Sequence, residues 1–245
     1  MKKIAAIILA AGKGKRMRSK NSNKVLSKLG DKQMIIHTVD WLEKLKLKLI
    51  IVVVGFAKKS VMDALGNRVA YAVQRKRLGT AHALMCALKK IPGEITDVLI
   101  LQGDDSALYK EQTIRKLIDI HLSSNVTLTF LTIDVDNPFG LGRVVRDKKD
   151  KLISVVEEKD AADDQRKIKE INPACYVFKV AFLKKYLGKI KKSEVTGEYY
   201  LTSLIDIAIK NNEKLEAVRG GKIAWRGINT LEELKEAQRL FLIKN

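Results

Sequence analysis

The sequence predicts an α/β fold built on a Rossmann-like, doubly wound sheet that is mixed but mainly parallel. Residues 4–10, 49–54 and 98–101 are continuous apolar runs, which is typical of strands buried on both faces of a largely parallel sheet. Helical patterns separate these runs, because apolar side chains recur at helical spacing in residues 81–88 and 114–122. Strands that alternate with helices need right-handed crossovers, which place helices on both faces of the sheet.

The remaining elements are shorter. Residues 126–133 are rich in threonine and branched side chains and predict one more strand. After about Asp134, residues 143–146 and 152–157 predict a hairpin around the polar turn 147–150. The sequence then predicts a polar loop at 161–169, a strand at 171–178, a helix at 201–209 and a C-terminal helix that opens with the capping box Thr230-Leu231-Glu232-Glu233. Because no linker-like segment or repeat is visible, we expect one domain.

Composition excludes several classes of protein. None of the apolar runs approaches the roughly 20 residues of a membrane span. The apolar start, residues 4–11, leads into a basic turn instead of a signal-peptide cleavage site. Cys86 and Cys175 are too few for a disulfide framework and lack metal-ligand spacing. We therefore expect a cytoplasmic protein without a membrane partner, either a monomer or a weak dimer.

The net charge of +19 is unusual and raises the hypothesis of nucleic-acid binding. The lysines are spread along the chain, however, and there is no basic tract with interleaved aromatic residues. A lysine-rich proteome would give the same composition, so nucleic-acid binding stays a minority hypothesis.

Ligands of open α/β sheets bind beyond the carboxyl ends of the strands, so we expect the site just after Ala10, Val54, Val73 and Leu101. The string Ala10-Ala11-Gly12-Lys13-Gly14-Lys15-Arg16-Met17 follows the first predicted strand. Its glycines let backbone amides approach an anion, and its basic side chains add positive charge. Met17 stands where the dinucleotide fingerprint needs a third glycine, and the Gly-Lys-Ser/Thr of a P-loop is absent. An ordinary basic surface turn is the alternative.

Together with further motifs, this string resembles the sugar-1-phosphate nucleotidyltransferases, and it is most similar to the uridyltransferase domain of the bacterial bifunctional enzymes of that family. The resemblance covers almost the whole chain. Its motifs are residues 9–17, Lys24-Val25-Leu26, Gln74 with 78–83, Leu101-Gln102-Gly103-Asp104, 140–146, 156–161, Glu170-Ile171-Asn172, 196–202 and 227–230. The family's GT-A-like fold implies a nucleotide-binding half at 1–134, a sugar-binding half at 135–229 and a C-terminal helix at 230–245.

The resemblance implies which residues hold the nucleoside triphosphate. The backbone of Ala10, Ala11, Gly12 and Gly14 would approach the phosphates, and Arg16 would bind the β- and γ-phosphates. Lys24 is implied as a catalytic residue near the sugar phosphate and the α-phosphate. A pyrimidine base would be read by Gln74, Gly79 and Thr80, although Thr80 could instead only cap the helix that follows.

The resemblance also implies a metal and a sugar site. Asp104, a catalytic residue, and Asn229 would bind Mg²⁺, whose other ligands are substrate phosphates and water. The residues implied to contact the sugar are Gly142, Glu157, Asn172, Tyr200 and Thr202. His37, His82 and His121 are left out of the mechanism, since a sugar phosphate is already an anion and needs no general base.

Three departures from the family's pattern bear on the substrates. Lys15 replaces a small hydroxyl residue, Asn23 replaces a proline, and Asp105-Ser106-Ala107 replaces an apolar-Pro-Leu stretch. Asp105 could adjust metal binding or face solvent. The bifunctional enzymes continue into an acetyltransferase β-helix that the sequence lacks, so we expect no acetyl transfer.

The leading hypothesis is transfer of a uridylyl group from UTP to N-acetylglucosamine 1-phosphate. The alternatives are transfer from UTP or dTTP to glucose 1-phosphate, and a catalytically silent module of nucleotidyltransferase type.

Overall fold

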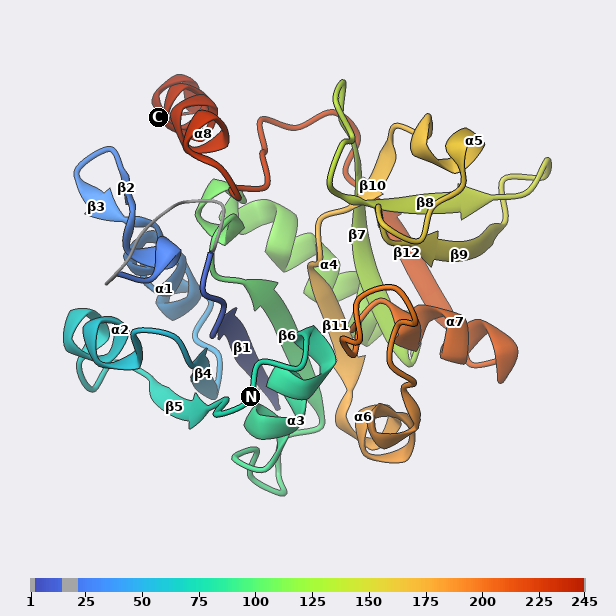
Figure 1. The fold of residues 1–245 in the computed structure, drawn as a ribbon. Helices are drawn as coiled ribbons and strands as arrows, with labels where there is room; N and C mark the ends of the chain where they lie inside the picture. Colours follow the sequence, from blue (N-terminus) through green and yellow to red (C-terminus); the bar gives the residue numbers. More distant parts are fainter. Residues whose placement is uncertain (1–2, 15–21, 245) are drawn as a thin grey trace.

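The computed structural model describes residues 3–14 and 22–244. Arg16, predicted to bind phosphate, and Lys15 lie outside the described residues. In the described part of the chain, a ten-stranded sheet runs in the order β5-β4-β1-β6-β11-β7-β10-β8-β9, with β12 beside β7 (Figure 1). Its strands are β1 (Ile4–Ala10), β4 (Leu49–Val54), β5 (Ala70–Val73), β6 (Asp97–Gln102), β7 (Leu128–Asp134), β8 (Gly142–Arg146), β9 (Leu152–Val156), β10 (Glu170–Asn172), β11 (Tyr176–Lys179) and β12 (Leu215–Arg219).

Helices flank the sheet on both faces, and the predicted α/β fold with a mixed, mainly parallel central sheet is confirmed. The helices are α1 (Met34–Lys44), α2 (Lys58–Leu65), α3 (Thr80–Leu88), α4 (Glu111–Ser123), α5 (Asp163–Arg166), α6 (Val180–Tyr186), α7 (Ser203–Lys210) and α8 (Leu231–Lys244). Shorter elements are the 3₁₀ turns η2 (Lys24–Leu26), η3 (Ser106–Leu108) and η4 (Leu187–Lys189) and the hairpin β2 (Lys28–Leu29) and β3 (Lys32–Gln33).

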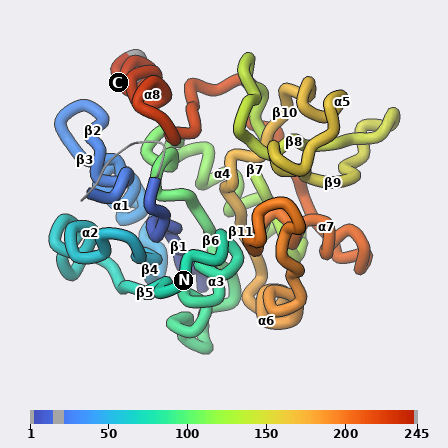
Figure 2. The backbone as a smooth tube through the Cα atoms, in the orientation of Figure 1, coloured from blue at the N-terminus to red at the C-terminus, as the bar shows by residue number. Residues whose placement is uncertain are grey.

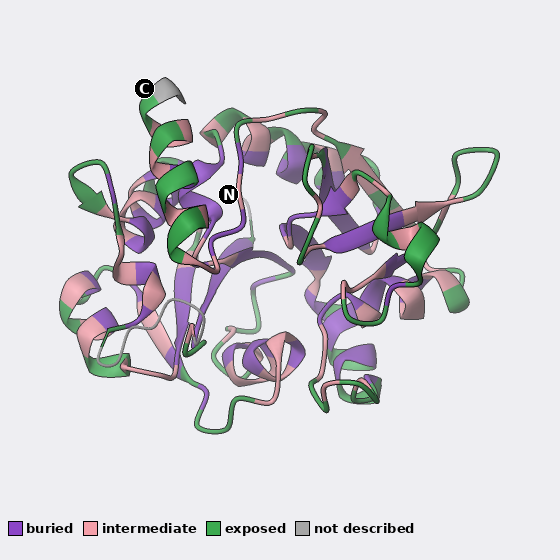
Figure 3. Ribbon diagram, turned by 45° about the horizontal axis from the view of Figure 1, so that its top comes forward, coloured by how far each residue is buried: buried purple, intermediate pink, exposed green. Residues whose placement is uncertain are grey.

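The strand β1 shows why a continuous apolar run is needed at the centre. It pairs in parallel with β4 on one side and β6 on the other, so that Ile8 lies opposite both Val52 and Leu101. Successive side chains of a strand point to opposite faces. Ile4, Ala6, Ile8 and Ala10 accordingly pack into one buried cluster, and Ala5, Ile7 and Leu9 pack into the other. The buried residues concentrate on these central strands (Figure 3).

The second half of the chain completes the same sheet. Every antiparallel pairing of the large sheet involves a strand that begins at Leu128 or later. The strand β11 lies between β6 and β7 and so joins the two halves. The hairpin predicted around residues 147–150 is present as β8 and β9, and the Asp147 carboxylate accepts hydrogen bonds from the backbone N–H of Lys149 and Lys151.

Two predicted elements were wrong in detail. Residues 171–178 were predicted as one strand, but Pro173 interrupts it and Ala174 adopts a left-handed φ of 55°, so β10 and β11 are separate strands. The segment 161–169, predicted as a loop, contains the short helix α5.

The C-terminal helix returns to the first half of the chain. It lies next to the hairpin of β2 and β3 (Figure 2), and the Phe241 ring centroid is 4.7 Å from that of His37. The predicted capping box is confirmed: the Thr230 hydroxyl accepts from the Glu233 N–H at 3.1 Å, and a Glu233 carboxylate oxygen accepts from the Thr230 N–H at 2.9 Å. None of the helices within residues 3–14 and 22–244 combines the length and apolar content needed to cross a bilayer.

Candidate functional site

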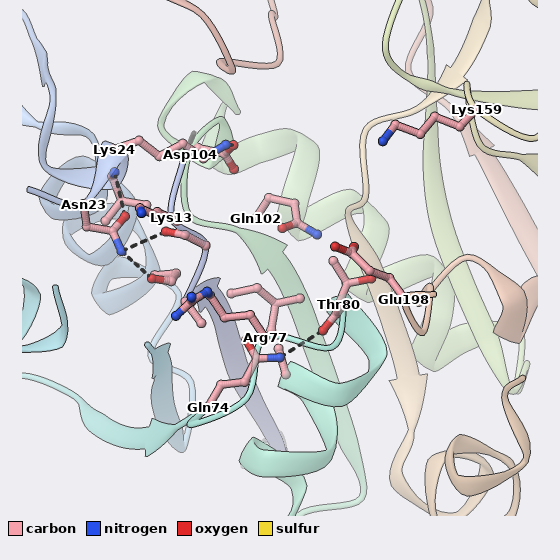
Figure 4. A pocket seen from close by; sticks show the side chains of 18 residues that line it. Lys13, Asn23, Lys24, Gln74, Arg77, Thr80, Gln102, Asp104, Lys159 and Glu198 are labelled. Atoms are coloured by element: carbon pink, nitrogen blue, oxygen red, sulfur yellow. Dashed lines mark hydrogen bonds and ion pairs between the residues drawn. The ribbon is translucent and has the colours of Figure 1, made fainter. Parts of the chain in front are cut away.

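Two cavities meet at the carboxyl ends of β1, β5 and β6. The larger has a volume of about 650 Å³ and is lined by the turn after β1, by Gln74 and by the start of α3 (Figure 4). The smaller, of about 250 Å³, lies against the second half of the chain. Both are lined by Lys24, Thr80, Gln102 and Asp104. A ligand in one cavity would therefore lie beside a ligand in the other.

The turn after β1 brings backbone to the larger cavity. Ala10, Ala11, Gly12 and Gly14 all line it, as predicted. Gly14 has a φ of +58°, and a Cβ at this position would lie 3.2 Å from the Lys24 Cβ. A larger residue at position 14 would therefore be strained and would press on Lys24.

Asn23 holds this turn in place, although the sequence identified it only as a departure. It is 2% exposed. Its Nδ2 donates to Ala10 O at 2.8 Å, to Phe56 O at 3.0 Å and to Gly12 O at 3.4 Å. Its Oδ1 accepts from the Val25 N–H at 3.2 Å and caps the turn η2 that carries Lys24. One side chain thus fixes the turn after β1, the turn after β4 and Lys24.

Lys24 joins the two residues predicted to bind metal. Its Nζ makes an ion pair with the Asp104 carboxylate and lies 3.2 Å from both Asn229 Oδ1 and Ile228 O. Asp104 and Asn229 are far apart in the sequence, yet both oxygens are within reach of one cation. The donor set therefore fits Mg²⁺, which prefers hard oxygen ligands. Among the described residues, no cluster of three or more His, Cys, Asp or Glu side chains could hold a metal.

The N-terminus of α8 positions Asn229. The same Glu233 oxygen that caps the helix also accepts from the Asn229 N–H at 2.7 Å. Arg226 donates to the other Glu233 oxygen at 3.0 Å. The Glu233 carboxylate therefore holds the backbone at Asn229, and Arg226 holds that carboxylate in place.

The turn before α3 contacts the second half of the chain. Gly79 has a φ of +102°, and a Cβ there would lie 2.5 Å from Tyr199 O, so only glycine fits. The Tyr199 N–H donates to Leu78 O at 2.8 Å, and the Ala81 N–H donates to Tyr199 O at 3.0 Å. The alternative that Thr80 only caps the helix is wrong. The cap position is Gly79, and the Thr80 hydroxyl accepts from the Leu201 N–H at 2.9 Å.

The predicted sugar residues lie around the smaller cavity with one exception. Gly142, Glu157, Asn172 and Thr202 line it. The Thr202 hydroxyl donates to Glu157 Oε1 at 2.8 Å, and burial raises the pKa of the Glu157 carboxyl. Tyr200 lines neither of the two cavities; its hydroxyl lies 2.6 Å from that of Thr196.

Glu157 and Asn172 both line the smaller cavity, and their neighbours set how they are placed there. A Cβ on Gly142 would lie 3.8 Å from Glu157 Oε2, so the glycine keeps space beside the carboxylate. Asn172 Oδ1 accepts from the Ala174 N–H at 3.0 Å, and Asn172 Nδ2 donates to the Tyr176 hydroxyl at 2.5 Å. Each of these bonds fixes the direction in which the Asn172 amide points.

Asp105 does not face solvent, so that alternative is wrong. It is 6% exposed, lines the smaller cavity, and its Oδ1 has no hydrogen-bond partner among the described residues. Burial and the charge of Asp104 raise the pKa of its carboxyl well above the usual range.

Among the residues that line the larger cavity without having been predicted are four polar side chains outside the turn after β1 and the turn η2. Arg77 and Gln102 come from the first half of the chain, and Lys159 and Glu198 come from the second (Figure 4). Lys159 and Glu198 lie inside motifs of the resemblance, which was the available signal for them. The charges of Arg77 and Lys159 add to that of Lys24 around a space open to an anion.

This arrangement defines a class of protein: an α/β protein with two adjoining cavities at the carboxyl ends of its central parallel strands, where open α/β sheets bind their ligands. The comparisons agree. Residues 5–242 match the family described as Nucleotidyl transferase. The chain therefore belongs to the nucleotidyl transferase family, and the resemblance seen in the motifs is confirmed.

Two relatives give the extent of the similarity. The chain is 39% identical over 240 residues to the Bifunctional protein GlmU of Caldanaerobacter subterraneus subsp. tengcongensis, across 98% of this chain and 52% of that protein. It is 41% identical over 241 residues to the Bifunctional protein GlmU of Caldicellulosiruptor saccharolyticus, across 97% and 52%. The chain spans about half the length of the curated relatives it matches.

A solved structure supports the fold. A Bacillus anthracis protein assigned as a glucose-1-phosphate thymidylyltransferase, in complex with sucrose, superposes with a TM-score of 0.81 at 23% identity. The match covers 97% of this chain and 95% of that one. At this identity the likeness bears on the fold alone.

Proposed function

We propose that this protein transfers a uridylyl group from UTP to N-acetylglucosamine 1-phosphate, with Mg²⁺, and releases UDP-N-acetylglucosamine and pyrophosphate. The observation that carries the proposal is the meeting of the two cavities at Lys24 and Asp104. In such a reaction the nucleotide and the sugar phosphate must lie side by side, with their phosphates at the junction. The similarity to a GlmU protein, which covers 98% of this chain and 52% of that protein, and membership of the nucleotidyl transferase family support the same proposal.

The chemistry requires positioning more than acid–base catalysis. An oxygen of the sugar phosphate forms a bond to the α-phosphorus, the bond from that phosphorus to the bridging oxygen breaks, and pyrophosphate leaves with the electron pair. No proton needs to be removed from the attacking group. Lys24 would neutralise charge between the two phosphates, and the turn at 10–14 would direct backbone amides to the triphosphate. Mg²⁺, held by Asp104 and Asn229, would supply electrostatic stabilisation of the leaving group.

The smaller cavity suits an acetylated sugar. Asn172 is buried and Glu157 is partly buried, and both line the cavity, where they can pair with hydroxyl and amide groups of a ligand. Leu141, Pro173, Ala174 and Trp225 add apolar surface in the same cavity, against which an acetyl methyl group could pack.

A substrate panel tests the proposal. The purified protein would be incubated with UTP, dTTP, CTP or ATP and with glucose 1-phosphate or N-acetylglucosamine 1-phosphate, and pyrophosphate release would be followed. We expect the highest kcat/KM for UTP with N-acetylglucosamine 1-phosphate, and loss of turnover in excess chelator. A preference for glucose 1-phosphate would show that the proposed acceptor is wrong, and a preference for dTTP would show that the proposed donor is wrong.

Absence of turnover with every pair, in protein that still binds UTP, would refute an enzymatic role and favour the silent module. The matched control is Asp119→Asn, which changes a carboxylate on α4 that lines neither cavity. It should retain the activity that Asp104→Asn loses.

A further inference from the structure

His82 has no place in the proposed chemistry, yet it contacts the residue that would read the base. Gln74 follows β5 directly, is 4% exposed and lines the larger cavity. Its backbone N–H donates to Val54 O at 2.8 Å. Its side-chain amide lies 3.0 Å from Gly79 O and 3.0 Å from His82 Nδ1. Gly79 is the residue that precedes α3 and His82 lies in the first turn of that helix, so the Gln74 amide contacts the start of α3 at two points.

The chemistry of these partners fixes the direction of the amide. A backbone carbonyl only accepts hydrogen bonds, so the Gln74 atom that faces Gly79 O is Nε2. The same Nε2 faces His82 Nδ1, which must then be the acceptor and carry no proton. Both N–H groups of the Gln74 amide are thereby used within the protein.

The Gln74 carbonyl oxygen is left for a ligand. Among the described residues, none donates a side-chain hydrogen bond to Gln74 Oε1. Because Gln74 lines the cavity (Figure 4), a base placed there meets a group that can only accept. Uracil carries an N–H at N3, whereas cytosine has a lone pair at N3. With the ring in the same position, cytosine would place its N3 lone pair against Oε1, and no hydrogen bond could form between these two atoms.

We propose that His82 is a positioning residue that holds the Gln74 amide in one orientation and so makes the site select an imide N–H, favouring uridine over cytidine nucleotides. The inference rests on the proposed function, since it assumes that the larger cavity holds the nucleotide. Without the Nδ1 acceptor, Gly79 O alone would favour this orientation, so the amide would turn more often to present Nε2, which would lower the penalty against cytosine. His82 would act only through Gln74, and would not touch the reacting phosphates.

The test measures nucleotide binding directly, so that it does not depend on turnover. Affinities for UTP and CTP would be determined by isothermal titration calorimetry without sugar phosphate, for the wild-type protein and for three variants. His82→Leu removes the acceptor. His82→Asn keeps one, since the asparagine Oδ1 can take the place of Nδ1. His37→Leu is the control, because His37 lies on α1, contacts Leu29 O at 2.7 Å and lines neither cavity.

We expect the wild-type protein and His37→Leu to prefer UTP, His82→Leu to lose about tenfold of that preference, and His82→Asn to recover most of it. A uniform loss of affinity for both nucleotides in His82→Leu would show a merely structural role and overturn the inference. An unchanged preference in His82→Leu, or a wild-type protein without preference for UTP, would overturn it as well. The failure of the proposed function can be told apart from the failure of this inference. The proposed function fails if the substrate panel shows no pyrophosphate release, whatever the ratio of the UTP and CTP affinities.

Discussion

Replacing Asn23 with alanine should destabilise the fold measurably, because this side chain makes several hydrogen bonds in a buried position. The substitution removes the donor to Ala10 O at 2.8 Å and to Phe56 O at 3.0 Å, and the longer contact to Gly12 O at 3.4 Å. It also removes the cap on the Val25 N–H. A hydrogen bond contributes about 1 kcal/mol net, and losing an N-cap costs about 1 kcal/mol. The expected loss is therefore about 3 kcal/mol of unfolding free energy.

Thermal unfolding would measure this loss. In a domain of this size, 1 kcal/mol corresponds to a shift in Tm of roughly 2–4 °C, so Asn23→Ala should lower Tm by about 6–12 °C. The KM for UTP should rise as well, because the same side chain holds the turn at 10–12 and the turn with Lys24. Asn67→Ala is the control: Asn67 is exposed, and the Tm should stay within about 1 °C. An Asn23→Ala protein with the wild-type Tm would refute this reasoning.

Proline at this position separates backbone from side-chain effects. Asn23 has a φ of −75°, which a proline ring also adopts. Asn23→Pro loses the same hydrogen bonds as alanine but reduces the entropy of the unfolded chain, an effect of about 0.4–1 kcal/mol. Its Tm should therefore lie between those of Asn23→Ala and the wild-type protein. A Tm below that of Asn23→Ala would contradict the backbone argument.

Three further substitutions test other parts of the cleft. Asp104→Ala should lower pyrophosphate release about 10³-fold or more and weaken Mn²⁺ binding, measured by paramagnetic resonance, while the circular dichroism spectrum stays unchanged; full activity in excess chelator would contradict this. Burial raises the pKa of the Glu157 carboxyl in the folded protein. The stability that the protonated carboxyl gives is therefore fully present below the unfolded pKa and is lost as pH rises through the folded pKa. Glu157→Gln should therefore raise Tm relative to wild type near about pH 8 but not near about pH 4, and an equal shift at both would refute the assignment. Glu233→Ala should raise several-fold the Mg²⁺ concentration needed for half-maximal activity, because Glu233 holds the Asn229 N–H; Glu233→Gln, which keeps an acceptor, should be close to wild type.

The central strands could be predicted from the sequence because their burial leaves a simple signal. Residues 4–10 and 49–54 are apolar throughout, and the structure has strands with these same bounds. Pro173 is a signal for a break between β10 and β11 in the sequence itself. The branched and aromatic residues around it nevertheless favoured the prediction of one continuous strand. The helix α5 has no buried residues, so its sequence has no apolar periodicity from which a helix could be predicted.

The site could be predicted only through the order of its motifs. Spacing along the chain does not show that Asn229 lies 3.2 Å from Lys24 Nζ, because that proximity depends on the path of the whole second half. Asn23 was missed as a positioning residue for a different reason: its role depends on three carbonyl groups that only the fold brings together. The available signal was a polar residue before a short apolar turn, where a capping side chain is common.

The predicted division of the chain into a nucleotide-binding half and a sugar-binding half concerns ligands, and the contacts between the two halves argue against two mechanically independent parts. The base turn at 78–81 is hydrogen-bonded to Tyr199, and the Thr80 hydroxyl accepts from Leu201 N, on the second half. Leu201 and Thr202 also line the smaller cavity. A movement of this turn would therefore break its backbone hydrogen bonds to Tyr199, which lies next to residues that line the smaller cavity. Gly79 already lies against Tyr199, so the turn has no room to move toward it. A ligand that fixes either side of this contact reduces the freedom of the other, and the second ligand then has less conformational entropy to lose on binding.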